Sequence, residues 1–103
     1  MLIVCSKNGV PVRLTIERWQ HIMNRHPEMA EQRERVLETV TEPELIQQGD
    51  CGEVLAIRFY PQTPWTSNYL LVVCREASLH DGFVLIAYFT SRPSGQRVAL
   101  WKR

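Results

Sequence analysis

The sequence predicts one α+β domain, in which an N-terminal hairpin and two helices pack on a three- to five-stranded antiparallel sheet. Three observations support this fold class. The chain has 103 residues, which suits a single domain with a single core. Apolar residues recur at helical spacing in the first half and as alternating or continuous runs in the second. The loops between the later runs are shorter than the crossovers that parallel strands need, so antiparallel pairing is expected.

The first half begins with a hairpin signal. Asn8-Gly9 lies between the apolar run of residues 2–5 and an alternating run that contains Val10, Val12 and Leu14. An Asn-Gly pair between two such runs is typical of a tight turn. These residues therefore predict a short N-terminal hairpin.

Two helices are expected to follow the hairpin. Thr15 is a suitable N-cap for the first, which should end at His26 because Pro27 disfavours α geometry at the residue before it. The second should start at about Pro27 and stop at Pro43. Its expected apolar stripe consists of Met29, Arg33, Val36, Leu37 and Val40.

The second half predicts strands. Residues 53–60 alternate, which places Leu55, Ile57 and Phe59 on one face, and Val54, Ala56, Arg58 and Tyr60 on the other. The apolar runs 69–75 and 83–90 predict a central hairpin with Asp81-Gly82 in its loop. Short strands are also possible at 45–47 and, as an edge strand or docked tail, at 98–101.

The net charge and the cysteines of the chain limit the classes of function that the sequence allows. The net charge is +1, which argues against a strongly basic nucleic-acid binder but allows a local positive cluster. The three cysteines, Cys5, Cys51 and Cys74, form no CxxC or CxxH pair, so neither a structural zinc nor any other metal or cofactor is expected. Without a visible signal peptide or an apolar run long enough for a membrane span, the chain is expected in the cytoplasm.

The densest polar cluster lies between the two expected helices and contains His21, Arg25, His26 and Glu28. His26 is expected near a helix end, where an imidazole can act as a general acid or base at neutral pH. The alternative is a packed junction residue, because His26 falls on the same stripe as Trp19. A zinc site is disfavoured, since His21 and His26 are five positions apart and have no evident third ligand.

A second set of candidates lies on the predicted strands. Arg58 and Arg75 interrupt apolar runs and suggest a patch for an anion such as phosphate, or else Arg58 pairs with Glu53 or Glu76 at a sheet edge. The last long strand ends in polar groups that suit either a binding site or an ordinary turn: Tyr88, Thr90, Ser91 and Arg92. The aromatic candidates for base stacking are Tyr60, Trp65 and Trp101, although such rings are more often core or loop anchors.

The order of these motifs resembles a group of small bacterial and phage-associated domains of the barnase–EndoU–colicin–RelE (BECR) nuclease fold. The resemblance covers about residues 12–92 and rests mainly on two elements, Arg25-His26-Pro27-Glu28 and Tyr88-Phe89-Thr90-Ser91-Arg92. It also includes Arg18-Trp19-Gln20-His21-Ile22, Pro43-Glu44-Leu45-Ile46, the strand with Arg58, and the hairpin containing Leu71-Val72-Val73-Cys74-Arg75-Glu76 and Asp81-Gly82-Phe83-Val84.

The resemblance implies two helices on a four-stranded antiparallel sheet and metal-independent RNA cleavage of a toxin or phage-effector type. It would make His26 the acid/base, with His21 as a second candidate, and Thr90 or Ser91 the group that positions the phosphate. Arg25, Arg58 and Arg75 would be phosphate-side cations, with Tyr88 and Arg92 beside the substrate. The implied partners are RNA and a cognate inhibitor protein. The near-neutral charge departs from the strongly basic surfaces usual among such toxins.

Three hypotheses follow for the function. An RNA-cleaving domain predicts that His26, an arginine and Thr90 converge in one cleft. A non-catalytic binding module predicts His26 buried against Trp19, without an open cleft, and a large exposed apolar patch. A hydrolase for another anionic substrate would share the arginine patch but lack stacking surfaces. The sequence does not decide among them, and it gives no oligomeric state.

Overall fold

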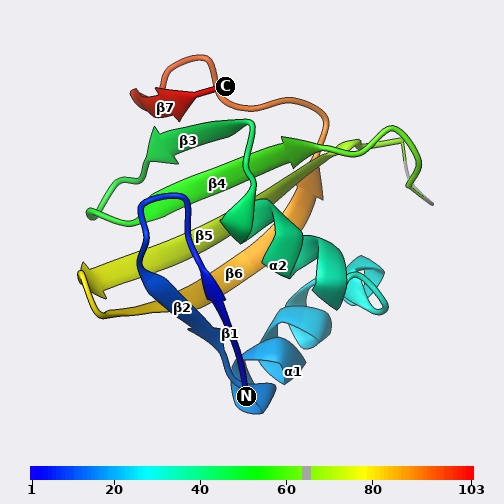
Figure 1. Cartoon of the computed structure of the whole chain (residues 1–103). Helices are drawn as coiled ribbons and strands as arrows, with labels where there is room; N and C mark the ends of the chain where they lie inside the picture. The colour runs from blue at the N-terminus through cyan, green and yellow to red at the C-terminus, as the bar shows by residue number, and fades with distance from the viewer. Residues whose placement is uncertain (64–65) are drawn as a thin grey trace.

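The computed structural model describes residues 1–63 and 66–103, and it has two helices on one side of a seven-stranded sheet (Figure 1). The spatial order of the strands is β1-β2-β6-β5-β4-β3-β7. The α+β class is therefore confirmed, but the sheet is larger than the predicted three to five strands and is mixed. The strands are β1 Leu2–Cys5, β2 Pro11–Leu14, β3 Leu45–Gln48, β4 Val54–Phe59, β5 Tyr69–Ser78, β6 Asp81–Thr90 and β7 Ala99–Lys102.

The N-terminal hairpin forms as predicted and belongs to the main sheet. Strands β1 and β2 are antiparallel, and Gly9 in the turn has a φ of 83°, which glycine adopts without strain. The prediction of a purely antiparallel sheet is wrong at one place, because β2 runs parallel to β6 through Val12 with Gly82 and Arg13 with Phe83. The chain between these strands includes both helices and supplies the long crossover that parallel pairing needs.

Helix α1 (Ile16–Arg25) has the predicted boundaries. The Thr15 hydroxyl accepts a hydrogen bond from the Arg18 amide at 3.1 Å, and His26 is the C-cap. The prediction of a second helix from Pro27 is wrong. A 3-10 turn, η1 (Pro27–Met29), comes first, and α2 (Arg33–Thr41) begins only after Glu31, whose φ of 71° is incompatible with a right-handed helix.

The second half of the chain forms the rest of the sheet. The central hairpin of β5 and β6 is confirmed, but its turn is Leu79-His80, since Ser78 pairs with Asp81. The predicted C-terminal strand is β7, which pairs antiparallel with β3 at the edge of the sheet. In the described part of the chain, neither helix is long and apolar enough to cross a membrane.

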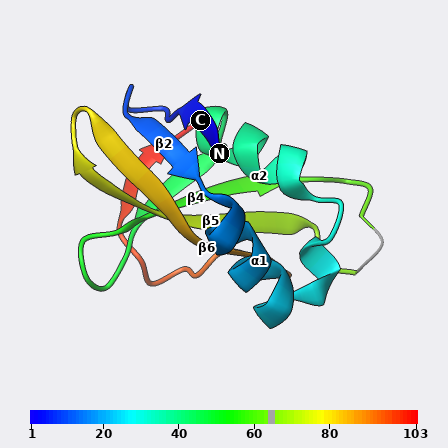
Figure 2. The ribbon, with the colours of Figure 1, turned by 90° about the horizontal axis from the view of Figure 1, so that it is seen from below.

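The two faces of the sheet differ in what covers them. The helices cover one face (Figure 2). They enclose the main core, in which Trp19, Ile22 and Val36 pack with Leu70 and Val72. We call the opposite side the outer face. It carries a small core of Leu55, Ile57 and Leu71, with Tyr69 and Tyr88 packed against it.

The segment of residues 91–98 connects β6 to β7 across the outer face. Its Ser94 carbonyl accepts a 2.8 Å hydrogen bond from the buried side chain of Gln47. This contact fixes the segment against β3. This segment therefore covers part of the outer face. The rest of the outer face is open to a ligand.

Candidate functional site

His26 lies where the end of α1 meets the edge of β6. Its backbone amide donates to the Ile22 carbonyl at 2.8 Å, which closes the last turn of the helix. Its imidazole stacks on the ring of Tyr88, with 5.4 Å between centroids and 25° between planes, and the side chain is 31% exposed. The binding-module hypothesis predicted that His26 is buried against Trp19. The partial exposure and the Tyr88 contact contradict that prediction.

The pairing of β6 explains why His26 can reach this edge. Strand β2 pairs with β6 only at Gly82 and Phe83, so none of the described strands borders the later part of β6 on that side. Helix α1 lies there instead, and the Arg18 guanidinium donates to the Leu85 carbonyl at 3.2 Å. Leu85 lies where the register between β5 and β6 shifts, which exposes that carbonyl to the helix.

Glu28 makes a polar contact with the His26 imidazole. One of its carboxylate oxygens, Oε2, is 3.5 Å from His26 Nδ1, and η1 holds the glutamate in this place. This distance is that of an ion pair, and no described residue forms a hydrogen bond with the imidazole. The arrangement leaves Nε2 as the ring nitrogen available for proton exchange with a substrate.

Aromatic rings continue from Tyr88 across the outer face. Thr90 follows Tyr88 on the same face and pairs with Tyr69 on β5. Tyr69 in turn meets Phe59 edge to face, with 5.2 Å between ring centroids, and Phe59 is 41% exposed. Tyr69 and Phe59 are not among the site residues predicted from the sequence. The alternation of residues 53–60, together with the strand register, is the signal that places them beside Thr90.

The polar residues after β6 and at the end of α1 flank this surface. Thr90 donates to the Arg92 carbonyl at 3.3 Å, which turns the chain away from the strand. Arg25, Ser91 and Arg92 are exposed, and no described residue forms an ion pair with either guanidinium. His21 is exposed on α1.

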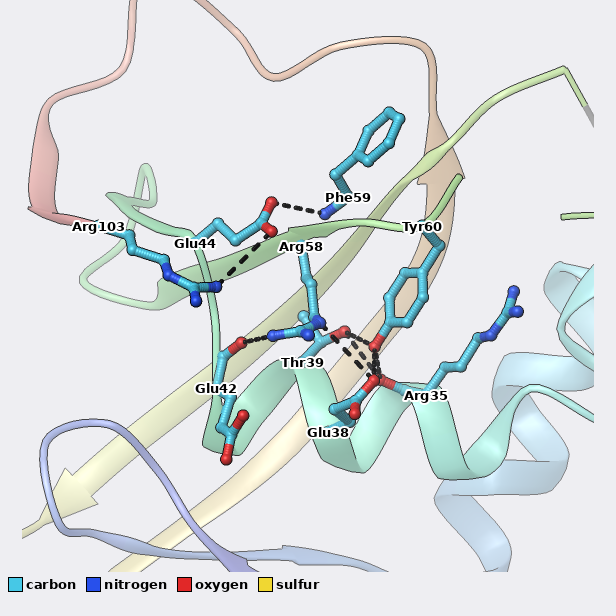
Figure 3. A network of polar contacts seen from close by, with 9 residues as sticks. All are labelled: Arg35, Glu38, Thr39, Glu42, Glu44, Arg58, Phe59, Tyr60 and Arg103. Carbon is cyan, nitrogen blue, oxygen red and sulfur yellow. Dashed lines mark hydrogen bonds and ion pairs between the residues drawn. The ribbon is translucent and has the colours of Figure 1, made fainter. Parts of the chain in front are cut away.

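Arg58 does not belong to this surface. It lies on the helix-covered face, where its Nη1 donates to the Glu42 carbonyl at 2.6 Å and its Nε lies 3.6 Å from Glu38 (Figure 3). The proposed pairing of Arg58 with Glu53 or Glu76 is therefore wrong as well. A cation held in this way cannot act on a phosphate at His26.

Arg75 lies on the outer face but at the far end of β5. It donates to the Cys51 carbonyl at 3.1 Å and is 3.9 Å from the Glu53 carboxylate. The Cys51 amide, which donates to Glu53, is the main reason why the pKa of that carboxyl is lowered. Arg75 is six positions from Tyr69, the partner of Thr90, a separation of about 20 Å along a strand. Arg58 and Arg75 therefore do not form one patch with Thr90.

The candidates for base stacking also have different environments. Tyr60 is buried against α2, and Trp101 is partly buried, with the Lys7 ammonium 4.7 Å from its ring centroid. Trp65 lies outside the described residues. None of these three supplies a described ring on the outer face, where Tyr69 and Phe59 lie instead.

Tyr60 belongs to a polar network that fastens α2 to β4 (Figure 3). Its hydroxyl donates to Glu38 at 2.6 Å, and the guanidiniums of Arg35 and Arg58 lie 4.8 and 5.7 Å from its ring centroid. Burial, followed by the hydrogen bond to Glu38, raises the pKa of Tyr60 to about 12. Because these contacts link a helix to a strand, we interpret the network as one that stabilises the fold.

Comparison with family models, with curated proteins and with solved structures finds no match to this chain. The likeness to the BECR group therefore rests on the residues quoted above. The described residues contain no cluster of three or more His, Cys, Asp or Glu side chains placed to hold a metal ion.

Proposed function

We propose that this chain is an RNA-cleaving domain that acts without a metal ion and uses His26 as its acid/base. The observation that carries the proposal is the position of the imidazole. It is partly exposed at the rim of the outer face, it stacks on Tyr88, and its Nδ1 lies beside Glu28. A held imidazole with one free nitrogen next to an open surface suits proton transfer to or from a bound substrate.

The reaction needs few protein groups. The 2′-hydroxyl of RNA attacks the adjacent phosphorus, the bond from phosphorus to the 5′-oxygen breaks, and the products are a 2′,3′-cyclic phosphate and a free 5′-hydroxyl. One group takes the proton of the 2′-hydroxyl and another protonates the leaving oxygen. His26 serves in one role, and Glu28, 3.5 Å from its Nδ1, is the second acid–base group at the site.

The surrounding residues suit a single-stranded polyanion. Arg25 and Arg92 are exposed cations on either side of the His26 and Tyr88 pair in the sequence, and Thr90 adds a hydroxyl on the same face as Tyr88. Cations close to a phosphate stabilise the charge that develops on it in the transition state. The rings of Tyr69 and Phe59 offer stacking surface for unpaired bases.

The test is RNA cleavage by purified protein in excess EDTA. Labelled total RNA is incubated with wild type and with a His26→Ala variant, and the product ends are analysed. The proposal predicts cleavage that survives EDTA, yields 2′,3′-cyclic phosphate ends and is lost in the variant. Absence of cleavage by folded wild-type protein would refute it.

A protein-binding role is the second candidate, favoured by one observation at the other edge of the molecule. Met1, Leu2 and Ile16 are 67, 38 and 65% exposed, and together with Leu14 and Trp19 they line a cleft of about 340 Å³. Exposed apolar side chains around a cleft are typical of interaction surfaces. If this role is the main one, wild-type protein leaves RNA intact and His26→Ala changes no measured interaction.

A further inference from the structure

A cavity lies on the outer face, away from His26. It measures about 510 Å³ and opens between β3, β4, β7 and the segment of residues 91–98. Leu45 and Ile57 form its apolar floor and Tyr69 borders it. Its polar groups are Glu44, Lys102 and Arg103. A volume of this size lies within the range of small-molecule sites, roughly 300–1,000 Å³.

The strand register connects the cavity to the His26 site. Tyr88 pairs with Leu71, Leu71 with Ile57, Ile57 with Leu45, and Leu45 with Lys102, so these five residues form one row across β6, β5, β4, β3 and β7. Four interstrand steps amount to about 19 Å. Tyr69 borders the cavity and pairs with Thr90, next to the proposed catalytic surface. The cavity and His26 therefore share one face, a few nucleotides apart along an extended chain.

The cavity lining offers groups for both parts of a nucleotide, the base and the phosphate. The floor and the Tyr69 ring offer apolar and aromatic surface for a base. Lys102 forms no ion pair with a described residue, and Arg103 is 68% exposed with its Nη1 3.9 Å from Glu44 Oε2. These two cations at the rim suit a phosphate.

Glu44 adds an element of selectivity. Its Oε1 accepts a hydrogen bond from the Phe59 amide at 3.0 Å, which fixes the carboxylate at the cavity. A carboxylate has about four lone-pair positions, so Glu44 keeps acceptor capacity for a ligand. Adenine, guanine and cytosine carry an exocyclic amine with two N–H donors, whereas uracil has no such amine and offers only its single N3–H.

We infer that this cavity binds one nucleotide of a single-stranded RNA, with the base on Tyr69 and the floor, the phosphate at Lys102 and Arg103, and amine-bearing bases preferred through Glu44. The inference deepens the proposed ribonuclease function and rests on it for the identity of the ligand as RNA. It assigns a substrate-binding subsite in addition to the site of bond cleavage.

The direct test is an NMR titration of isotope-labelled protein with the four ribonucleoside 3′-monophosphates. Binding is measured from the changes in the amide chemical shifts. We expect shifts at Leu45, Ile57, Tyr69 and Lys102, with the uridine nucleotide binding most weakly. Lys102→Gln should weaken binding by about tenfold, the usual effect of losing one charged contact. Lys7→Gln is the matched control, because Lys7 lies over Trp101, which is adjacent to Lys102 on β7 and so faces the other side of the strand.

The outcomes separate the subsite from the catalytic proposal. Wild-type protein that cleaves RNA but shows no nucleotide-dependent shifts at the cavity overturns the subsite and leaves the ribonuclease in place. Equal weakening by Lys7→Gln and Lys102→Gln also overturns it, since a general charge effect would then explain binding. Shifts at the cavity without any RNA cleavage support the nucleotide site and refute the ribonuclease. On an RNA oligonucleotide, Lys102→Gln should raise KM and leave kcat unchanged.

Discussion

His26 depends for its position on the Tyr88 ring, which contacts it at a centroid distance of 5.4 Å. We predict that Tyr88→Ala lowers kcat for RNA cleavage by about three- to tenfold, the range that corresponds to the loss of one aromatic pair. Tyr88→Phe keeps the ring and should retain wild-type kcat. Equal loss in both variants would contradict a positioning role of the ring, and the thermal unfolding of each variant checks that it is folded.

Tyr60 gives a residue-scale prediction about stability. Its pKa is raised from 10.0 to about 12, chiefly by burial, so the native state keeps the neutral phenol. Above pH 10 the unfolded chain ionises first, and the free energy of unfolding should fall as the pH rises towards 12. Tyr60→Phe should cost about 1 kcal/mol at neutral pH through the lost hydrogen bond to Glu38 and should remove this part of the alkaline fall.

Urea unfolding as a function of pH measures both effects. Burial also raises the pKa of the Cys74 thiol, from 9.0, so its share of the alkaline fall starts near pH 9 and should persist in Tyr60→Phe. Cys74→Ala removes that share and separates the two groups. An unchanged fall between pH 10 and 12 in Tyr60→Phe would show that the phenol is not the group responsible.

At the scale of elements, one side of strand β6 borders two different elements, β2 and α1. The first part pairs with β2 and the later part borders α1. Gly82 lies at the parallel pairing, and a Cβ built there would be 3.0 Å from the Arg75 carbonyl oxygen, 3.2 Å from Val10 Cγ1 and 3.3 Å from Val12 Cγ2. Gly82→Ala should therefore lower the free energy of unfolding by about 1–3 kcal/mol.

The matched control for this substitution is Gly95→Ala. A Cβ at Gly95 meets nothing within 4 Å, and its φ is not in the positive range. The change should stay within about 0.5 kcal/mol of wild type in the same urea titration. A neutral Gly82→Ala would contradict the close packing of the N-terminal hairpin on β6.

Local signals predicted most of the elements, because caps and breakers act on neighbouring residues. Thr15 and Pro27 set the ends of α1, and the alternation of residues 53–60 assigned both faces of β4. The interruption between η1 and α2 depends on one residue, Glu31, in a backbone conformation for which the sequence has no glycine. Helical periodicity continued across that point and therefore overextended the second helix.

At the scale of the molecule, the sheet decides which predicted site residues can meet. Arg58 and Arg75 both interrupt apolar runs, but they are on opposite faces, and each has partners from α2 or from the β3–β4 turn. Face and register depend on pairing between distant segments, which residue patterns along the chain do not encode. The same reason explains why the parallel contact of β2 with β6, and the place of Tyr69 beside Thr90, were not predicted.

We propose above that His26 performs acid–base chemistry on RNA at the rim of the outer face. The most direct test compares RNA cleavage in excess EDTA by wild type, His26→Ala and His80→Ala. His80 is the matched control, because it is exposed in the β5–β6 turn at the opposite end of β6 from Tyr88.

We predict that wild type and His80→Ala cleave RNA to 2′,3′-cyclic phosphate ends, and that His26→Ala loses at least about a hundredfold in rate, as expected for the removal of an acid–base group. Undiminished cleavage by His26→Ala, or no cleavage by a folded wild type, would contradict the claim. Loss of cleavage in His21→Ala but not in His26→Ala would likewise contradict it and transfer the acid–base role to His21.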